Sequence, residues 1–371
     1  MVSSPQPARL LVSQSVGVFC EGSMVQIGDR FVGREHAPFV IAEMSGNHNG
    51  SLERALEIVD AIAATGAHAL KLQTYTADTM TLDCDHPDFV IGEADSLWHG
   101  RKLYDLYDEA HTPWDWHRPI FERAKSHGML AFSTPFDDTA VDFLDELGVP
   151  CFKIASFENA DLPLIRKAAS KGKPLIISTG MATLAAMGEA VEVARSAGAA
   201  DVILLKCTST YPASPADSHL LTIPHMREAF GCEVGISDHT LGIGAAIAAV
   251  SLGGTVIEKH VTLQRADGGV DSAFSLEPPE LKMLVEESER ARQSLGRVHY
   301  GPSNKEKAAL KYRRSLYVVA DIKAGEQFSA QNVRAIRPGF GLAPKHYDAV
   351  IGRRAARDIA RGTALSWDLL A

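Results

Sequence analysis

"PLIISTGMATLAAMGEAVEVARSAGAADVILLKCTS", residues 174–209, contains two short apolar runs separated by a longer Ala-rich segment. The runs "PLIISTG" and "DVILLKCTS" are rich in Ile, Leu and Val and are bounded by polar residues, as strands are. The segment between them has helical length and composition. This stretch therefore predicts a strand, a crossing helix and a second strand parallel to the first.

The same alternation recurs along the chain. Six more runs of this kind occur: "FVIAEM" (39–44), "HALKLQT" (68–74), "MLAFSTP" (129–135), "CFKIASF" (151–157), "CEVGISDHT" (232–240) and "TVIEKHVT" (255–262). Eight β–α repeats over roughly 250 residues predict a (β/α)8 TIM barrel, an α/β fold in which helices cover a closed parallel sheet. A chain of 371 residues leaves room for a small second domain.

One helix can be predicted in detail from "SLERALEIVDAIAATG". Ser51 is a suitable N-terminal cap, and Gly66 is a suitable C-terminal stop. Leu56, Val59 and Ile62 recur at helical spacing, so we expect them on one buried face.

A long connection of 54 residues, 75–128, separates the second and third runs. It includes the aromatic segment "LWHGRKLYDLYDEAHTPWDWH". An insertion of this size on the catalytic face of a barrel favours a lid or a substrate loop. The alternative is a packed surface excursion whose tryptophans belong to the core.

The composition, 46% hydrophobic and 22% charged, is that of an ordinary globular protein. A net charge of -9 with no long Lys/Arg run argues against nucleic acid or an anionic membrane as a partner. No stretch is apolar and long enough to span a bilayer. Five cysteines without a C-x-x-C pattern favour the reducing cytoplasm. We expect residues 1–23 to be a disordered extension.

Polar residues occupy the predicted carboxyl ends of the strands, where barrel enzymes carry their working groups. In a closed barrel these residues form a ring around its carboxyl end, here called the mouth. The ring brings cations, hydroxyls, imidazoles and carboxylates together. Its members are Glu43, Lys71, Ser133, Thr134, Lys153, Ser156, Ser178, Thr179, Lys206, Ser209, Ser237, His239, Glu258 and His260.

Two of these residues, His239 and His260, follow neighbouring strands, so both imidazoles can reach one ion. Two imidazoles favour a first-row metal such as Mn, Co, Fe or Zn over Mg. With water and substrate in the remaining positions, such a site is catalytic. The alternative is two unrelated histidines that happen to end adjacent strands.

The composition changes near the C-terminus. We expect a barrel domain over residues 24–297, a polar linker over 298–311 and a small domain over 312–371. "DIKAGEQFSAQNV" (321–333) and "DIARGTALSWDLL" (358–370) resemble each other and indicate an internal pseudo-repeat. A module of about sixty residues has a marginal core, so we expect it to dock on a barrel or on a partner subunit.

Several segments, "IAEMSGNHNGSLERALEIVDAIAATGAHALKLQTYTADTMTLD", "FKIASFE", "ISTGM", "CTSTYP", "SDHT" and "EKH", resemble the sialic acid synthase family. That family joins phosphoenolpyruvate to an N-acylated hexose. The resemblance runs from about Val25 to the C-terminus, and the tail is similar to the family's antifreeze-like (SAF) β-clip domain. "SGNHN", "LYDLYDEAHTPWDWH", "FSTPFDDTAVDFL" and "DSAFSLEP" are most similar to the members that make pseudaminic acid.

The resemblance implies a role for each matching residue. A divalent metal, manganese first with cobalt or magnesium as alternatives, is assigned to His239 and His260. Catalytic roles fall to Glu43, Lys71, His260 and Asp271. Phosphoenolpyruvate is assigned to Lys71, Thr134, Lys153, Ser156, Ser178, Ser209 and Ser237, and the sugar to Glu43, Asn47, Tyr211, Asp271 and Arg337.

Two of these assignments carry further consequences. Arg337 would reach an N-acyl group from the partner's tail, which implies a homodimer. Ser209 replaces the Asn of neuraminate synthases, "CTNIYP", so a phosphate contact there passes to the Ser hydroxyl or is lost.

The chemistry of the residues supports this class of substrate. Phosphoenolpyruvate carries up to three negative charges and requires Lys and hydroxyl donors. Glu43 is our candidate base, the alternative being a contact to a sugar hydroxyl or to Lys71. Trp98, Trp114 and Trp116 suit methyl and acetyl groups better than a sugar phosphate.

Three other functions compete with the synthesis of pseudaminic acid. They are neuraminate or legionaminate synthesis, a sugar-phosphate aldolase, and a non-enzymatic sugar-binding protein. The last has no use for the full set of polar strand ends.

Overall fold

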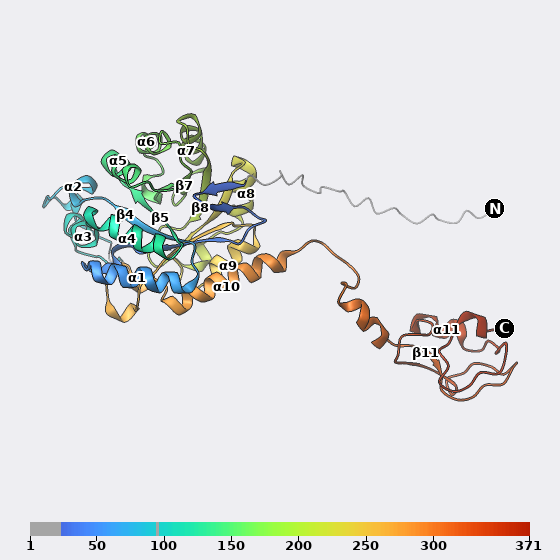
Figure 1. The fold of residues 1–371 in the computed structure, drawn as a ribbon. Helices are drawn as coiled ribbons and strands as arrows, with labels where there is room; N and C mark the ends of the chain where they lie inside the picture. Colours follow the sequence, from blue (N-terminus) through green and yellow to red (C-terminus); the bar gives the residue numbers. More distant parts are fainter. Residues whose placement is uncertain (1–23, 94–95) are drawn as a thin grey trace. The chain divides into compact units, whose positions relative to one another are not determined.

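The computed structural model describes residues 24–93 and 96–371, so the predicted extension 1–23 lies outside the described residues. Within these ranges, parallel strands close into an eight-stranded barrel, with β10 pairing back to β3. This confirms the predicted fold (Figure 1). The strands are β3 (Phe39–Glu43), β4 (Ala69–Thr74), β5 (Leu130–Pro135), β6 (Phe152–Ile154), β7 (Leu175–Ser178), β8 (Val202–Cys207), β9 (Glu233–Asp238) and β10 (Val256–His260).

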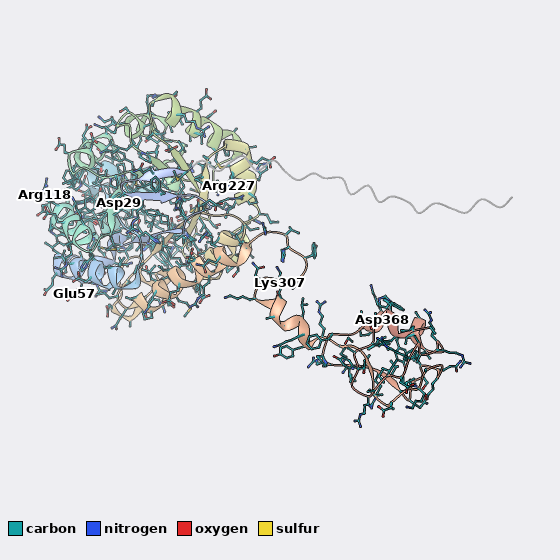
Figure 2. All side chains as sticks on the ribbon, turned by 45° about the vertical axis from the view of Figure 1, so that its right-hand side comes forward. Asp29, Glu57, Arg118, Arg227, Lys307 and Asp368 are labelled. Carbon is teal, nitrogen blue, oxygen red and sulfur yellow. The ribbon has the colours of Figure 1, made fainter. Side chains whose placement is uncertain are left out.

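Helices cover the outside of the barrel, and α1 and α10 run side by side there (Figure 1). Figure 2 shows Glu57 of α1 and Arg118 of α4 on the outside of this shell. None of the helices in the described ranges has the length and apolar character needed to cross a membrane. The shell consists of α1 (Leu52–Thr65), α4 (Trp114–Ser126), α5 (Asp138–Glu146), α6 (Leu162–Ala169), α7 (Leu184–Ser196), α8 (Thr222–Phe230), α9 (Gly244–Ser251) and α10 (Pro278–Leu295).

Helix α1 begins and ends where its sequence predicts. The Ser51 hydroxyl accepts a hydrogen bond from the Arg54 amide at 3.2 Å, and Gly66 ends the helix with φ at 83°. Val59 and Ile62 are fully buried, as expected. Leu56 is only partly buried, because the buried stripe runs through Ile58 instead.

The long insertion between β4 and β5 contains α2 (Ala77–Met80) and α3 (Leu103–Ala110) before α4 begins. At the other end of the barrel lies a hairpin of β1 (Val25–Ile27) and β2 (Arg30–Val32). Its Arg30 guanidinium donates to the Gly128 carbonyl at 3.0 Å, just before β5. The hairpin therefore packs where strands begin, away from their carboxyl ends.

A second compact unit extends from Arg297 to Ala371. It contains a 3-10 helix over Glu306–Tyr312, which includes Lys307 (Figure 2), and then β11 (Ser315–Val318), β12 (Val333–Ile336) and α11 (Tyr347–Val350). Its own core is formed by Leu316, Val318, Ile322, Phe328, Val333, Val350, Ile359 and Leu365.

The two halves of the predicted pseudo-repeat pair with each other in this unit. The Ile322 amide donates to the Ile359 carbonyl at 2.9 Å, and the Ile359 amide donates back at 2.8 Å. The equivalent isoleucines of the repeats therefore form an antiparallel bridge.

Candidate active site

Two lysines face one carboxylate inside the carboxyl end of the barrel. Lys71 Nζ lies 3.9 Å from Glu258 Oε2, and Lys153 Nζ lies 3.7 Å from Glu258 Oε1. All three side chains are buried. The site therefore places two ammonium groups next to one carboxylate at the carboxyl end of the barrel.

Lys71 makes two further contacts. It forms an ion pair with Glu43 at the end of β3 and donates to Thr134 Oγ1 at 3.1 Å. The ion pair is the alternative role that the sequence left open for Glu43. Burial, opposed by the charge of Glu258, lowers the pKa of Lys71 to about 8.

Lys153 and Glu258 each form a hydrogen bond with a serine hydroxyl. The Lys153 ammonium donates to Ser178 Oγ at 2.6 Å, and Ser237 Oγ donates to Glu258 at 3.0 Å. These residues come from β6, β7, β9 and β10, so closure of the barrel brings them together. The combination of ammonium and hydroxyl donors suits a phosphate or carboxylate group.

Two more of the predicted anion ligands, Ser156 and Ser209, meet at Gly180. The Gly180 amide donates to Ser156 Oγ at 3.1 Å. A Cβ atom on Gly180 would lie 2.1 Å from Ser209 Oγ and 2.7 Å from Ser156 Oγ. Glycine is therefore needed for both hydroxyls to occupy this place.

Two carboxyl groups of the site received no role from the sequence. Burial opposes ionisation of Glu258, but the charges of Lys153 and Lys71 outweigh it and keep its pKa below the usual value. Glu158 has a buried Oε2 without a hydrogen-bond partner, and burial raises its pKa to about 7. Glu258 could have been found from the sequence because it lies two residues before His260. Residues two apart on a strand face the same side, which here is the interior of the barrel.

The two predicted metal ligands lie together, with ring centroids of His239 and His260 5.4 Å apart. His239 Nδ1 lies 3.0 Å from the Thr208 carbonyl, which leaves Nε2 available to an ion. His260 Nδ1 is buried and has no hydrogen-bond partner. These residues fit a divalent ion held by two imidazoles. With two imidazoles as its protein ligands, such an ion would take water and substrate in its remaining positions.

An aromatic wall borders the histidines. The Tyr211 ring lies 4.4 Å from His239 and 6.0 Å from Trp98, centroid to centroid. Trp114 instead stacks on Phe143, and Trp116 packs against His48, as in the core-packing alternative that the sequence left open. Of the three tryptophans, Trp98 is the one beside Tyr211.

Asp271 is held at the mouth by the segment after β3. Ser45 Oγ donates to Asp271 Oδ2, and this carboxylate lies 3.6 Å from His260 Nδ1. The Asn47 side-chain amide donates to Ser275 Oγ at 2.9 Å, and Ser275 donates to the Asp271 carbonyl at 2.7 Å. The donor group of Asn47 is therefore engaged in fixing the loop that carries Asp271.

Two other polar residues of the barrel are not part of this cluster. Ser133 bonds to Thr74 at 2.6 Å, because it projects from the opposite face of β5 to Thr134. Lys206 donates to the neighbouring Cys207 carbonyl. Arg337 belongs to the second unit, where it follows β12 and is exposed.

Comparisons with known proteins show which proteins the chain is similar to. Residues 58–300 match the NeuB family, and residues 313–371 match the SAF domain. The chain is 45% identical to pseudaminic acid synthase of Campylobacter jejuni, over 88% of this chain and 95% of that protein. Its identity to pseudaminic acid synthase of Helicobacter pylori is 40%, over 89% of this chain and 97% of that protein.

A solved structure supports the fold as well. The N-acetylneuraminic acid synthetase of Leptospira borgpetersenii superimposes with a TM-score of 0.69 at 31% identity, covering 79% of this chain and 96% of that one.

Proposed function

Because the chain belongs to the NeuB family, we propose that it condenses phosphoenolpyruvate with 2,4-diacetamido-2,4,6-trideoxy-L-altrose and water to give pseudaminic acid and phosphate. The observation that carries this proposal is the pair of buried lysines facing one carboxylate, next to two histidines with free ring nitrogens. The pseudaminic acid synthases named above support the choice of sugar.

Phosphoenolpyruvate binds to the ammonium groups of Lys71 and Lys153. Thr134, Ser178 and Ser237 supply hydroxyl donors around them, and Ser156 and Ser209 supply two more beside Gly180. The two ammonium groups attract the anion, although Glu43 and Glu258 offset part of their charge, and the hydroxyls orient it.

His239 and His260 hold the metal, for which manganese is our first choice and cobalt or magnesium the alternatives. A divalent ion at this position supplies Lewis-acid polarisation of the sugar aldehyde. Asp271, whose loop Asn47 fixes, lies beside His260, so the sugar hydroxyls bind on that side. Tyr211 and Trp98 offer an apolar surface for its methyl and acetyl groups.

The reaction requires two proton transfers with the protein and one within the substrate. The methylene carbon of phosphoenolpyruvate attacks the aldehyde carbon, and the aldehyde oxygen takes a proton to become a hydroxyl. Water then adds to the cationic carbon and loses one proton to the protein. Cleavage of the C–O bond moves the second proton of that water to the departing phosphate and leaves a ketone. The paired Lys71 and Glu43 perform the two transfers with the protein, Lys71 as the donor and Glu43 as the acceptor.

The experiment that tests this function is phosphate release by metal-stripped protein with Mn(II) added back. Release that requires both metal and the altrose sugar supports the proposal. A preference for N-acetylmannosamine, or for its diacetamido analogue, would reassign the protein to neuraminate or legionaminate synthesis. Release without metal would remove the metal role of the two histidines.

A homodimer completes the site in this proposal, with Arg337 of one chain reaching the N-acyl group bound by the other. Complementation tests it. Arg337→Ala chains and His239→Ala chains, each inactive, are mixed after partial unfolding and refolded together. Restored activity supports the exchange of tails, and an inactive mixture contradicts it.

We place the reaction in the cytoplasm. The described cysteines, Cys84, Cys151, Cys207 and Cys232, are all free thiols, which supports a reducing compartment.

A further inference from the structure

A buried ion pair lies directly behind the two histidines. Lys259 Nζ contacts Asp238 Oδ2 at 2.7 Å, and each side chain is only 1% exposed. Asp238 immediately precedes His239, and Lys259 immediately precedes His260. The pair therefore joins the two strands at the residues adjacent to the proposed ligands.

This pair lies on the opposite face of the sheet from the active site. Side chains alternate along a strand, and Ser237 and Glu258 bond to each other on the inner face. Asp238 and Lys259 consequently point outward, and neither can contact a substrate within the barrel. Any effect of the pair on the reaction must act through the backbone.

The pair is also the last point at which β9 and β10 are held together. Their register ends with Lys259 opposite Asp238. His260 is instead paired with Glu43 of β3. Beyond the ion pair, the β9–β10 ladder no longer sets the separation of the two imidazoles.

The same two side chains fix the backbone beyond His239. Asp238 Oδ1 accepts a hydrogen bond from the Thr240 amide at 2.9 Å, and Lys259 donates to the Thr240 carbonyl. The residues on both sides of His239 are therefore tied to the residue that precedes His260.

A buried ion pair contributes little to the free energy of unfolding, because the desolvation of both charges offsets their attraction. Two apolar side chains of similar size often stabilise a fold as well. A role in positioning the two neighbouring histidines explains the presence of the Asp238–Lys259 pair better. We propose that Asp238 and Lys259 are positioning residues, which set the separation of His239 and His260 and thereby the affinity of the site for a divalent ion. The inference rests on the metal site of the proposed function.

The test is binding of Mn(II) to the full chain, followed by the electron paramagnetic resonance signal of the free ion, together with thermal unfolding. The double variant Asp238→Leu/Lys259→Met replaces the pair by apolar groups of similar size and is expected to unfold near the wild-type temperature. We expect its Kd for Mn(II) to rise by about 10-fold or more, as for other residues that orient metal ligands. Lys259→Arg, which keeps the pair, is expected to retain most of the affinity.

Arg227 and Glu233 provide a control, because the half-buried Arg227 of α8 forms an ion pair, 2.7 Å long, with the buried Glu233 at the start of the same β9 strand. The variant Arg227→Met/Glu233→Leu is expected to bind Mn(II) like the wild type. Wild-type affinity in Asp238→Leu/Lys259→Met would overturn the positioning role. Loss of affinity in both double variants would do the same, because it would indicate general loosening. Failure of the wild type to bind Mn(II) would overturn the metal site itself, and the inference with it.

Discussion

Lys71 and Glu258 face each other at 3.9 Å inside the closed ring of strands. Lys153 approaches the same carboxylate, and Glu43 pairs with Lys71, so two cations and two acidic residues share one buried space. A small anion that enters this space adds negative charge next to the lysines. The protonation of Lys71 should therefore control how well that anion binds.

We expect the KM for phosphoenolpyruvate to rise above pH 8. The pKa of Lys71 is about 8, so the side chain is charged below that pH and neutral above it. Loss of the charge weakens binding of the anion. Initial rates between about pH 6.5 and 9.5 measure this in the wild type. In Lys71→Arg, which stays charged but cannot donate the proton, the Kd for phosphoenolpyruvate, measured by calorimetry, should not rise over the same range. A KM that is independent of pH over this range would contradict the assignment.

In Glu258→Gln, the KM for phosphoenolpyruvate should begin to rise at a lower pH than in the wild type. The carboxylate raises the pKa of Lys71, so its neutral analogue lets that pKa fall. Two buried lysines lose their shared partner, which we expect to cost about 3–5 kcal/mol of unfolding free energy. Urea unfolding and the pH profile measure the two effects. Glu57→Gln, at an exposed position of α1, is the control and should change neither.

Asn47→Ala should weaken binding of the sugar and leave binding of phosphoenolpyruvate unchanged. The amide of Asn47 fixes Ser275 and through it Asp271, which we place next to the sugar. We expect the KM for the sugar to rise and kcat to fall, each by about 10-fold, with the KM for phosphoenolpyruvate unchanged. Asn304→Ala, in an exposed segment, is the control. An equal rise in both KM values would instead indicate general damage to the mouth.

Gly180→Ala should weaken binding of phosphoenolpyruvate. The new methyl group would displace Ser209 and Ser156, because it would lie 2.1 and 2.7 Å from their hydroxyl oxygens. We expect the KM for phosphoenolpyruvate to rise by about 10-fold, since each lost hydrogen bond to a charged group is worth about 1.5 kcal/mol or more. Gly188→Ala lies in α7 with only Phe230 nearby, so it should stabilise the protein and leave the KM unchanged. Normal kinetics in Gly180→Ala would show that these serines do not bind the substrate.

The barrel could be predicted from the sequence because each strand is a short apolar run with a polar end. The period of two also predicted His239 and His260 on one side, and their rings lie together in the structure. In a closed parallel sheet all strands end at the same face. The residue that follows each apolar run can therefore be placed at that face from the sequence alone.

Contacts across the mouth could not be predicted in this way. The sequence gives no reason why Glu258 should face two lysines, because that depends on which strands close the ring. Asn47 resembled a sugar ligand, yet its amide is bonded to Ser275, more than two hundred residues away along the chain. Lys206 and Ser133 also occupy strand ends, but the pleat turns them away from the lysine cluster.

The bridge between Ile322 and Ile359 bears on the order in which the protein can form during synthesis. The core of the second unit includes Leu365, Leu369 and Leu370, and the Ala371 amide donates to the Arg354 carbonyl. None of these contacts can exist until the final stretch of this sequence has left the ribosome. The barrel, whose last strand ends at His260, can therefore fold while the tail is still unformed. A translation product cut a few residues short would keep a folded barrel attached to a tail that cannot close.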